Sequence, residues 1–430
     1  MKKISLKLLA VAILAMFSAQ VASATGVDVL VQSLVQQGVI SAGEGQRIMV
    51  ESREQARALT AAAESPAAPM WVQRLNFSGD LRFRSQINTT GGEDARVRER
   101  VRVRFGIDTM AHDNLMMSLG FATGQYPTGV PTSRNHTFAG FRQVPFSIDH
   151  VFLRYTGIDW ATISLGKLRG HQLFQTSQLV WDSDINPEGV AVEFTVPGRL
   201  GRFSFWGNAA WYTLGELRHD QPANRHIGKP TIILAQPGFT YSRGRTRVRG
   251  AVAMQQFNIK GKEALMGGHP AFMMNLTGQD YTLINPSFDI RRRRAFGTNH
   301  TFTLHGDFVK NVDGSTAGNS ATENDRQAYL LGARFGYESI RGFGQWNVGL
   351  SHSRYERNAI PRGMANSNAF SGMPHQGWQY TASVGLLSNL TFQLTYFNLV
   401  GLSGAGGGAD FNGLRGVEQQ VWHFNLLHRF

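Results

Sequence analysis

Arginine occurs at every second position from Arg96 to Arg104. Successive side chains of a β-strand point to opposite faces, so this spacing places five guanidinium groups on one face of a strand. The opposite face carries mainly valine, at Val97, Val101 and Val103. Rows of arginine or lysine that line a water-filled passage favour anions. The pattern therefore indicates a chemistry of anion attraction, without a nucleophile or a metal.

Two other segments repeat this spacing. Arg82 and Arg84 precede the first row, and a second row runs from Arg243 to Arg249. A hairpin centred near Gly91 would place Arg82 opposite Arg100 and Arg84 opposite Arg98. An alternative is that these are ordinary wall charges, balanced by acids on a nearby loop. The candidate anion-attracting residues are Arg82, Arg84, Arg98, Arg100, Arg102, Arg104, Arg247 and Arg249.

Carboxylates gather in the stretch from Val180 to Gly189, which contains Asp182, Asp184 and Glu188. Acids in such a loop could face the basic rows. A calcium loop is an alternative, because residues 182–193 carry oxygen ligands at calcium-like spacing. However, Pro187 stands where a calcium loop requires glycine, and no flanking helices are expected. We therefore disfavour calcium and expect no cofactor or metal.

The elements that position these residues are strands. From residue 71 onward apolar and polar residues alternate, as in Leu75 to Phe83. Short connections are expected near 112–113, 157–159, 197–199, 242–244, 339–344 and 388–389. Long polar or glycine-rich connections are expected near 87–95, 125–147, 168–187, 213–229, 311–325, 357–376 and 400–416. The two kinds alternate except between about 257 and 298, where one more strand within 279–290 restores the order.

This alternation predicts an all-β fold, a transmembrane antiparallel β-barrel of 16 strands over residues 71–430. An even strand number with short turns at one end and longer loops at the other is typical of outer-membrane barrels. Sixteen strands leave an aqueous channel, whereas eight would be filled by side chains. Strand counts of 14 or 18 remain open. Arginine on a lipid face costs about 2–4 kcal/mol at the bilayer midplane, so the arginine rows must face water.

The first 70 residues precede the barrel. Residues 1–24 combine Lys2, Lys3 and Lys7, an apolar run and a small-residue site at 22–24, which predicts a secretory signal peptide. Residues 25–63 predict a short periplasmic helical segment, with a capping box at Ser41 and Glu44. A subunit-joining coiled coil is the alternative for this segment. Residues 64–70 are a linker rich in alanine and proline.

The C-terminal segment alternates up to a terminal aromatic residue. Phe424, Leu426 and Phe430 lie on one face of a final strand, together with His428. A last strand that ends in Phe resembles the recognition signal for outer-membrane barrel assembly, although His428 departs from the apolar residue usual at its place.

Composition agrees with an exported membrane protein. Charged residues make up only 17% of the chain, and cysteine is absent, which excludes disulfides and cysteine-based sites. The formal net charge is +13, and removal of the three lysines of the signal peptide leaves it near +10. Export argues against nucleic acid as the partner of this basic chain.

The signal peptide, the helical segment, Gly166-Lys167 and the stretch from Trp181 to Gly189 resemble the bacterial "putative porin" family, which is similar in architecture to general and phosphate-selective porins. The resemblance covers essentially the whole chain and implies a trimeric outer-membrane channel. In general porins a loop at the place of residues 168–189 folds inward, so Asp182, Asp184 and Glu188 become candidates for a constriction. Phosphate specificity is not implied, because phosphate-selective porins place arginine rows and lysine groups in the lumen, whereas here arginine dominates.

These observations predict a passive, anion-preferring porin for small hydrophilic solutes in the outer membrane of a Gram-negative bacterium. Its expected partners are outer-membrane lipid, lipopolysaccharide, the barrel-assembly machinery and two further copies of the chain. An outer-membrane barrel enzyme and a structural or adhesive barrel are the alternatives. The sequence contains no Gly-x-Ser-x-Gly, HExxH or phosphate-loop motif, so an enzyme is disfavoured.

Overall fold

A computed structural model describes residues 31, 35, 41–63, 74–124, 132–198, 200–215, 229–259, 280–313, 325–361, 363–368, 374–402 and 416–430. The chain divides into two compact units, Met1–Arg74 and Leu75–Phe430. The expected signal peptide, the first half of the helical segment and the 64–70 linker lie outside the described residues.

The described part of the first unit is one helix, α3 (Ala42–Ala63). The expected capping box is confirmed at its start. Glu44 N–H donates to Ser41 Oγ at 3.2 Å, and Ser41 N–H donates back to Glu44 Oε2 at 3.3 Å. These two bonds satisfy backbone donors that have no partner within the first turn of a helix. Among the helices described, none has the length and apolarity needed to cross a membrane.

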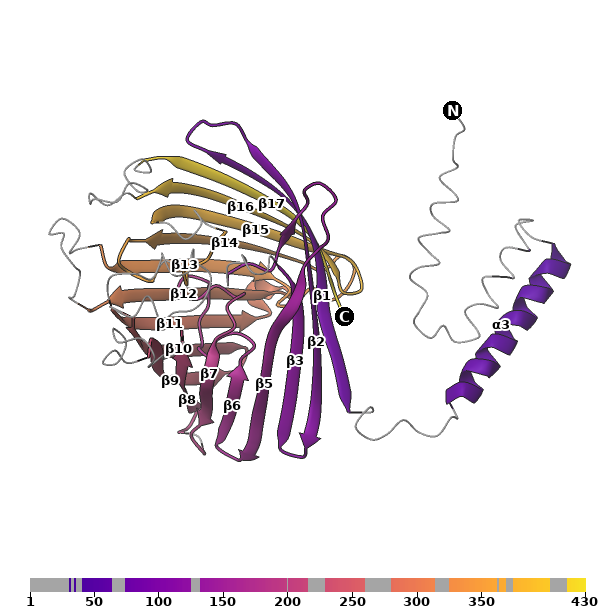
Figure 1. Cartoon of the computed structure of the whole chain (residues 1–430), viewed down its shortest axis with the longest axis horizontal. Helices are drawn as coiled ribbons and strands as arrows, with labels where there is room; N and C mark the ends of the chain where they lie inside the picture. Colours follow the sequence, from indigo (N-terminus) through magenta and orange to yellow (C-terminus); the bar gives the residue numbers. More distant parts are fainter. Residues whose placement is uncertain are drawn as a thin grey trace, which may run out of the picture. The chain divides into compact units, whose positions relative to one another are not determined.

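The second unit is a closed antiparallel barrel of 16 strands, as the sequence predicts (Figure 1). Each strand pairs with the next, and β1 pairs with β17 to close the wall. A short additional strand, β4 (His136–Thr137), lies within the β3–β5 connection and pairs with β2. The barrel strands are β1 (Leu75–Thr90), β2 (Arg96–His112), β3 (Leu115–Thr123), β5 (Phe146–Ile158), β6 (Ala161–Lys167), β7 (Glu188–Thr195), β8 (Phe203–Thr213), β9 (Thr231–Arg243), β10 (Thr246–Asn258), β11 (Tyr281–Arg293), β12 (Thr301–Asn311), β13 (Gln327–Gly336), β14 (Trp346–Tyr355), β15 (His375–Leu387), β16 (Leu390–Gly401) and β17 (Glu418–Arg429).

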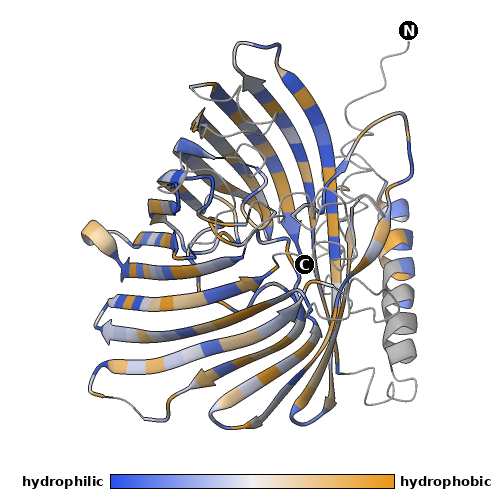
Figure 2. Cartoon of the chain, turned by 60° about the vertical axis from the view of Figure 1, so that its left-hand side comes forward, coloured by the Kyte–Doolittle hydropathy of each residue, from blue (hydrophilic) through white to orange (hydrophobic). Residues whose placement is uncertain are grey.

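The alternating pattern sorts side chains between the two faces of the wall, as the bands of hydropathy along each strand show (Figure 2). On β10, Val252 and Met254 are about half exposed on the outer face, whereas Ala253 and Gln255 on the inner face are fully buried. Burial on the inner face means that other protein segments cover this part of the lumen wall.

The strand missing from the regular pattern is β11, which ends at Arg293, three residues beyond the expected segment. The run from Arg291 to Arg294 does not alternate, which favours a turn or a rim patch, but Arg291 to Arg293 form the end of β11. Arg294 starts the following turn in the left-handed conformation. With β11 in place, seven turns alternate with eight loops, and every loop except the β1–β2 connection is longer than the turns.

The register expected for the first hairpin is wrong by two residues. Arg82 lies opposite Arg102 and Arg84 lies opposite Arg100, where we expected Arg100 and Arg98. The physical reason is the turn. Gly91 and Gly92 both adopt positive φ, of 61° and 80°, which moves the centre of the hairpin from Gly91 to Gly92. A shift of one residue in the centre moves each cross-strand partner by two.

Candidate pore and constriction

The interior of the barrel contains a cavity of about 900 Å³. Its lining extends from residues of the short turns, such as Arg341 and Asn389, to residues at the loop end, such as Asn366 and His375. Arg82, Arg84 and Arg102 line it from the β1–β2 wall, and Asp182 and Asp184 line it from the loop between β6 and β7. The structure thus brings together two of the three predicted acids and three of the predicted arginines.

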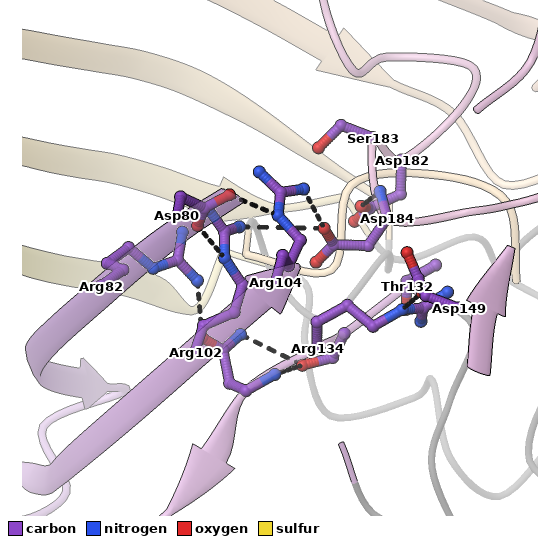
Figure 3. Close-up of polar contacts among 12 residues, drawn as sticks. Asp80, Arg82, Arg102, Arg104, Thr132, Arg134, Asp149, Asp182, Ser183 and Asp184 are labelled. Atoms are coloured by element: carbon purple, nitrogen blue, oxygen red, sulfur yellow. Dashed lines mark hydrogen bonds and ion pairs between the residues drawn. The ribbon is translucent and has the colours of Figure 1, made fainter. Parts of the chain in front are cut away.

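Asp80 organises the basic wall at the level of Arg102 and Arg104 (Figure 3). Its Oδ1 accepts from Arg102 Nη2 at 2.7 Å and its Oδ2 accepts from Arg104 Nε at 2.6 Å. The side chains of Asp80 and Arg102 are each only 9% exposed. From the loop, Asp184 Oδ1 lies 3.8 Å from Arg102 and 3.7 Å from Arg104. Two carboxylates therefore face two arginines at this level.

Arg82, which lies opposite Arg102, and the next arginines toward the loop end, Arg84 and Arg100, have neutral partners. Arg84 Nε donates to Asn425 Oδ1 at 2.7 Å and its Nη1 donates to Asn368 Oδ1 at 3.0 Å. Arg82 Nη2 donates to Asn135 Oδ1 at 2.5 Å, and Arg100 Nη1 donates to Gln86 Oε1 at 3.1 Å. Amide oxygens fix the orientation of these guanidinium groups but leave their charge in place. The buried Nε atoms of Arg82, Arg98 and Arg100 have no hydrogen-bond acceptor among the described residues.

The loop of residues 168–187 crosses the lumen from β6 and β7 to the opposite wall. Phe174 exchanges two hydrogen bonds of 2.8 Å with the Gln236 side chain on β9. Ser177 Oγ donates to Asp307 Oδ2 on β12 at 2.6 Å. Trp181 Nε1 donates to Gln255 Oε1 on β10 at 2.7 Å. These contacts fix the loop on strands that lie far from its own ends in the barrel.

An apolar cluster inside the barrel supports these polar anchors. Trp181 is 1% exposed and packs edge-on to Tyr212 and beside Phe257. Leu168, Val180 and Ile185 of the loop bury against inner-wall residues of β8 to β14. Burial of a large apolar side chain stabilises a fold by about 1.5–3 kcal/mol. The hydrophobic core of the described barrel therefore lies under this loop, on the wall opposite the arginines.

Asp182 joins the loop to a second inward segment, residues 363–368 from the β14–β15 connection. Its Oδ2 accepts from Ser367 N–H at 3.1 Å and from Ser367 Oγ at 3.3 Å. Its own N–H donates to Met364 O at 2.7 Å. Burial, together with the neighbouring charge of Asp184, raises the pKa of the Asp182 carboxyl to about 6. This group therefore changes its charge within the mildly acidic range.

Other predicted residues lie away from this cavity. Glu188 begins β7 on an exposed position and pairs with Lys167 Nζ at 2.6 Å. Arg247 lies near the β9–β10 turn, half-buried, and Arg249 lies under the loop beside Phe174. Each carboxylate of the considered calcium stretch has its own partner, and no group of three or more metal-ligating residues occurs within the described ranges.

Sequence reasoning missed Asp80 and the amide partners of the arginines. Asp80 could have been found, because it shares the face of Arg82 and Arg84 at every second position. Asn425 could have been found only by pairing β17 with β1, which places it beside Arg84. Asn135 and Asn368 come from loops, where period-two spacing carries no signal.

The fold and the lumen define a class, the outer-membrane β-barrel channels. Residues 86–291 and 278–412 match the family described as "Putative porin". The chain therefore belongs to this family, whose place is the outer membrane of Gram-negative bacteria. Family and fold indicate a channel rather than an enzyme.

Solved structures with the same fold include OprB of Pseudomonas putida, at 9% identity and a TM-score of 0.54, with 84% of this chain and 95% of that chain covered. OmpF of Salmonella typhi, solved in complex with daunomycin, is similar over 83% of this chain and 97% of its own, at 12% identity and a TM-score of 0.46. No curated protein sequence matches the chain.

Proposed function

We propose that this porin is a passive diffusion channel that prefers anions and small anionic solutes, without catalysing a reaction. The observation that carries the proposal is the imbalance of charge on the lumen face of β1 and β2. Seven arginines, Arg82, Arg84 and every second residue from Arg96 to Arg104, share this face with Asp80, and Asp184 of the loop faces them. The unpaired charges raise the local concentration of anions in the narrowed lumen.

We further propose that the inward loop of residues 168–187 forms a constriction in the channel. Asp184 of the loop lies 3.8 Å from Arg102 and 3.7 Å from Arg104, so the loop narrows the cavity beside the arginine wall (Figure 3). A solute in the remaining space meets acids on the loop side and Arg82 and Arg84 on the wall side, and this field orients solutes that carry a dipole. Glu188 is left out of this constriction because it pairs with Lys167.

The test is the reversal potential of purified protein in planar bilayers under a potassium chloride gradient. The native chain should pass chloride in preference to potassium. Arg98→Gln with Arg100→Gln should lower the chloride-to-potassium ratio by about fivefold, because removal of two charges from the lumen face of β2 changes the energy of an ion beside that face by roughly 1 kcal/mol.

A matched control is Arg243→Gln with Arg245→Gln, which removes two exposed arginines at the β9–β10 turn. This variant should leave the ratio nearly unchanged. Equal passage of potassium and chloride through the native channel would reject the anion preference, while a conductance of zero from folded barrels would reject the open channel.

We also propose that the chain assembles as a homotrimer, on the basis of its family, and that outer-membrane lipid and lipopolysaccharide surround it. Phe424, Leu426 and Phe430, on the outer face of β17, would be the contact for the barrel-assembly machinery. Cross-linking of unheated protein in mild detergent tests the trimer. The expected ladder ends at three copies, and a ladder that ends at one contradicts it.

A further inference from the structure

A second cavity, of about 550 Å³, lies on the other side of the inward loop. It is lined by the β5–β6 turn at Asp159 and Trp160, by strands β6, β7, β8 and β10, and by loop residues His171–Gln175. Gln175 lines this cavity as well as the main one, so the loop separates the two spaces. The anion-preferring path along β1 and β2 does not use this second space.

Arg249 is the distinctive group of this cavity. Its guanidinium carbon lies 4.2 Å from the ring centre of Phe174 and 4.9 Å from that of Trp206. The Phe174 backbone is held by its bonds to Gln236, and the Trp206 ring is held by the bond from its Nε1 to Thr240 Oγ1 at 3.1 Å. Contacts with ring faces use the faces of a guanidinium group and leave its N–H edge available.

The charge of Arg249 is not fully compensated. Its cross-strand neighbour Asp289 forms an ion pair with Arg291, so two arginines share one carboxylate. Arg249 itself has no hydrogen-bond acceptor among the described residues. Arg154 and Glu193, which also line the cavity, are partly exposed, and their charges offset each other because Arg154 Nη2 bonds to Glu193 Oε2 at 2.5 Å.

Apart from Asp159, which is exposed at the β5–β6 turn, the remaining polar groups of the cavity are neutral or already bonded. Burial lowers the pKa of His171 to about 4, so this ring is uncharged at neutral pH. Asn208 Nδ2 donates to Gln236 Oε1 at 2.9 Å. One cation with a free edge, beside two aromatic rings, therefore dominates the recognition chemistry of this space.

We propose that this second cavity is a binding site for an organic anion that carries a carboxylate on a flat apolar body. The carboxylate pairs with the N–H edge of Arg249 in the two-bond geometry that guanidinium and carboxylate share. The flat body packs against the rings of Phe174 and Trp206. A cavity of this size accommodates a small organic ligand. This inference depends on the proposed function, because the channel supplies the solute that reaches the site.

Benzoate is the probe, and binding is measured by ligand-observed saturation-transfer NMR with the folded full chain in detergent. Native protein should bind benzoate saturably and should bind acetate, which lacks the ring, and benzyl alcohol, which lacks the charge, much more weakly. Arg249→Gln should weaken benzoate binding by about tenfold or more, as expected for loss of a charge-assisted pair. Phe174→Ala should weaken it by roughly fivefold.

Arg247→Gln is the matched control, because it removes a charge of the same type from the same strand face two residues away. It should change the benzoate affinity less than about twofold. Absence of saturable binding to folded native protein, an unchanged affinity in Arg249→Gln, or an equal loss in Arg247→Gln would each overturn the site. The chloride-to-potassium ratio tests the channel separately, so anion preference without benzoate binding rejects only this inference.

Discussion

At the scale of single residues, the lumen wall contains two kinds of arginine. Arg102 and Arg104 share the carboxylate of Asp80, so most of one charge is cancelled. Arg84 and Arg100 bond to amide oxygens, which hold the side chain without cancelling its charge. The field that attracts anions thus comes mainly from the second kind, and Asp80 has a structural role beside it.

Asp80→Asn tests this division. The change leaves Arg102, which is buried, without its main carboxylate partner. Breaking a buried ion pair on one side costs about 3–5 kcal/mol, so the unfolding temperature of the barrel should fall. This temperature is measured as the point at which heated protein changes from the folded to the unfolded mobility in gel electrophoresis. The anion preference should rise at the same time, because a carboxylate leaves the wall. Both quantities are measured on refolded protein.

The control for this change is Asp94→Asn, in the exposed turn between β1 and β2. It removes the same charge without removing a partner of an arginine in the barrel wall. If Asp80→Asn and Asp94→Asn unfold at the same temperature, Asp80 does not stabilise the wall.

The placement of the arginines could be predicted from spacing alone, whereas their partners could not. Period two assigns Arg82 to Arg104 to one face, because strand geometry is local. The bond from Arg84 to Asn425 joins residues from opposite ends of the chain. It depends on closure of the barrel and on the relative shift of strands β1 and β17, which no local pattern encodes.

At the scale of elements, the inward loop owes its position to Trp181. Trp181→Ala removes the bond to Gln255 and leaves a large void against Tyr212 and Phe257. Changes of this size in a core cost about 3–5 kcal/mol, which is enough to release the loop from the wall. Single-channel recordings should then show a larger and noisier conductance than that of the native protein.

Trp378→Ala is the control, because Trp378 lies 43% exposed on the outer face of β15. It should leave the conductance unchanged. A Trp181→Ala channel with native conductance and native noise would mean that the other anchors, at Gln236 and Asp307, suffice to hold the loop.

The junction between the two inward segments should depend on pH through Asp182. Its pKa of about 6 in the folded protein lies above its ordinary value of 3.8, so ionisation is disfavoured by folding. The junction is therefore fully stable below pH 3.8, and it loses stability as the pH rises from there through about 6. A shift of about two units corresponds to roughly 3 kcal/mol. Arg82, Arg84 and Arg102, which line the same cavity, act against this loss.

The measurement is thermal unfolding of native protein and of Asp182→Asn between pH 4 and pH 8. The amide costs a constant amount by placing a donor near Ser367, so the difference between the two proteins is the readout. Native protein should lose stability relative to Asp182→Asn as pH rises through 6. A difference that stays constant over this range contradicts the role of Asp182.

The prediction that residues 168–187 fold inward comes from the family resemblance and not from the residues themselves. Apolar residues such as Leu179, Val180 and Trp181 indicate burial, but they do not say where. Their partners Tyr212, Phe257 and Leu283 lie on distant strands, at inner-face positions that a porin of pure alternation would make polar. Apolar residues on inner positions of β8 to β11 are the signal that a loop covers them.

At the scale of the whole molecule, stability depends on the seam where the first strand, β1, pairs with the last strand, β17. Neighbouring strands of the barrel are joined by their own turns or loops, but β1 and β17 are joined only by side-by-side pairing. At the end of this seam Gly79 N–H donates to Phe430 O at 3.0 Å and Phe430 N–H donates to Gly79 O at 3.2 Å. The last residue of the chain therefore completes the wall.

Gly79 is required at this seam because the Phe430 ring covers it. A Cβ atom at Gly79 would lie 2.6 Å from Phe430 Cζ and 2.4 Å from the backbone oxygen of Arg104. Overpacking of this kind costs about 1–3 kcal/mol, so Gly79→Ala should lower both the refolded fraction and the unfolding temperature. Gly106→Ala is the control, since its new atom would meet its nearest neighbour at 3.6 Å, an ordinary contact.

The same geometry predicts that a second substitution, Phe430→Ala, restores the refolding of Gly79→Ala only in part. Phe430→Ala removes the ring clash but not the contact with the Arg104 backbone, which cannot move without disturbing the β1–β2 pairing. Gly79→Ala combined with Phe430→Ala should therefore refold better than Gly79→Ala alone and worse than Phe430→Ala alone. If Gly79→Ala refolds as well as Gly106→Ala, the seam tolerates crowding, and the terminal Phe430 acts in assembly alone and not in closing the barrel.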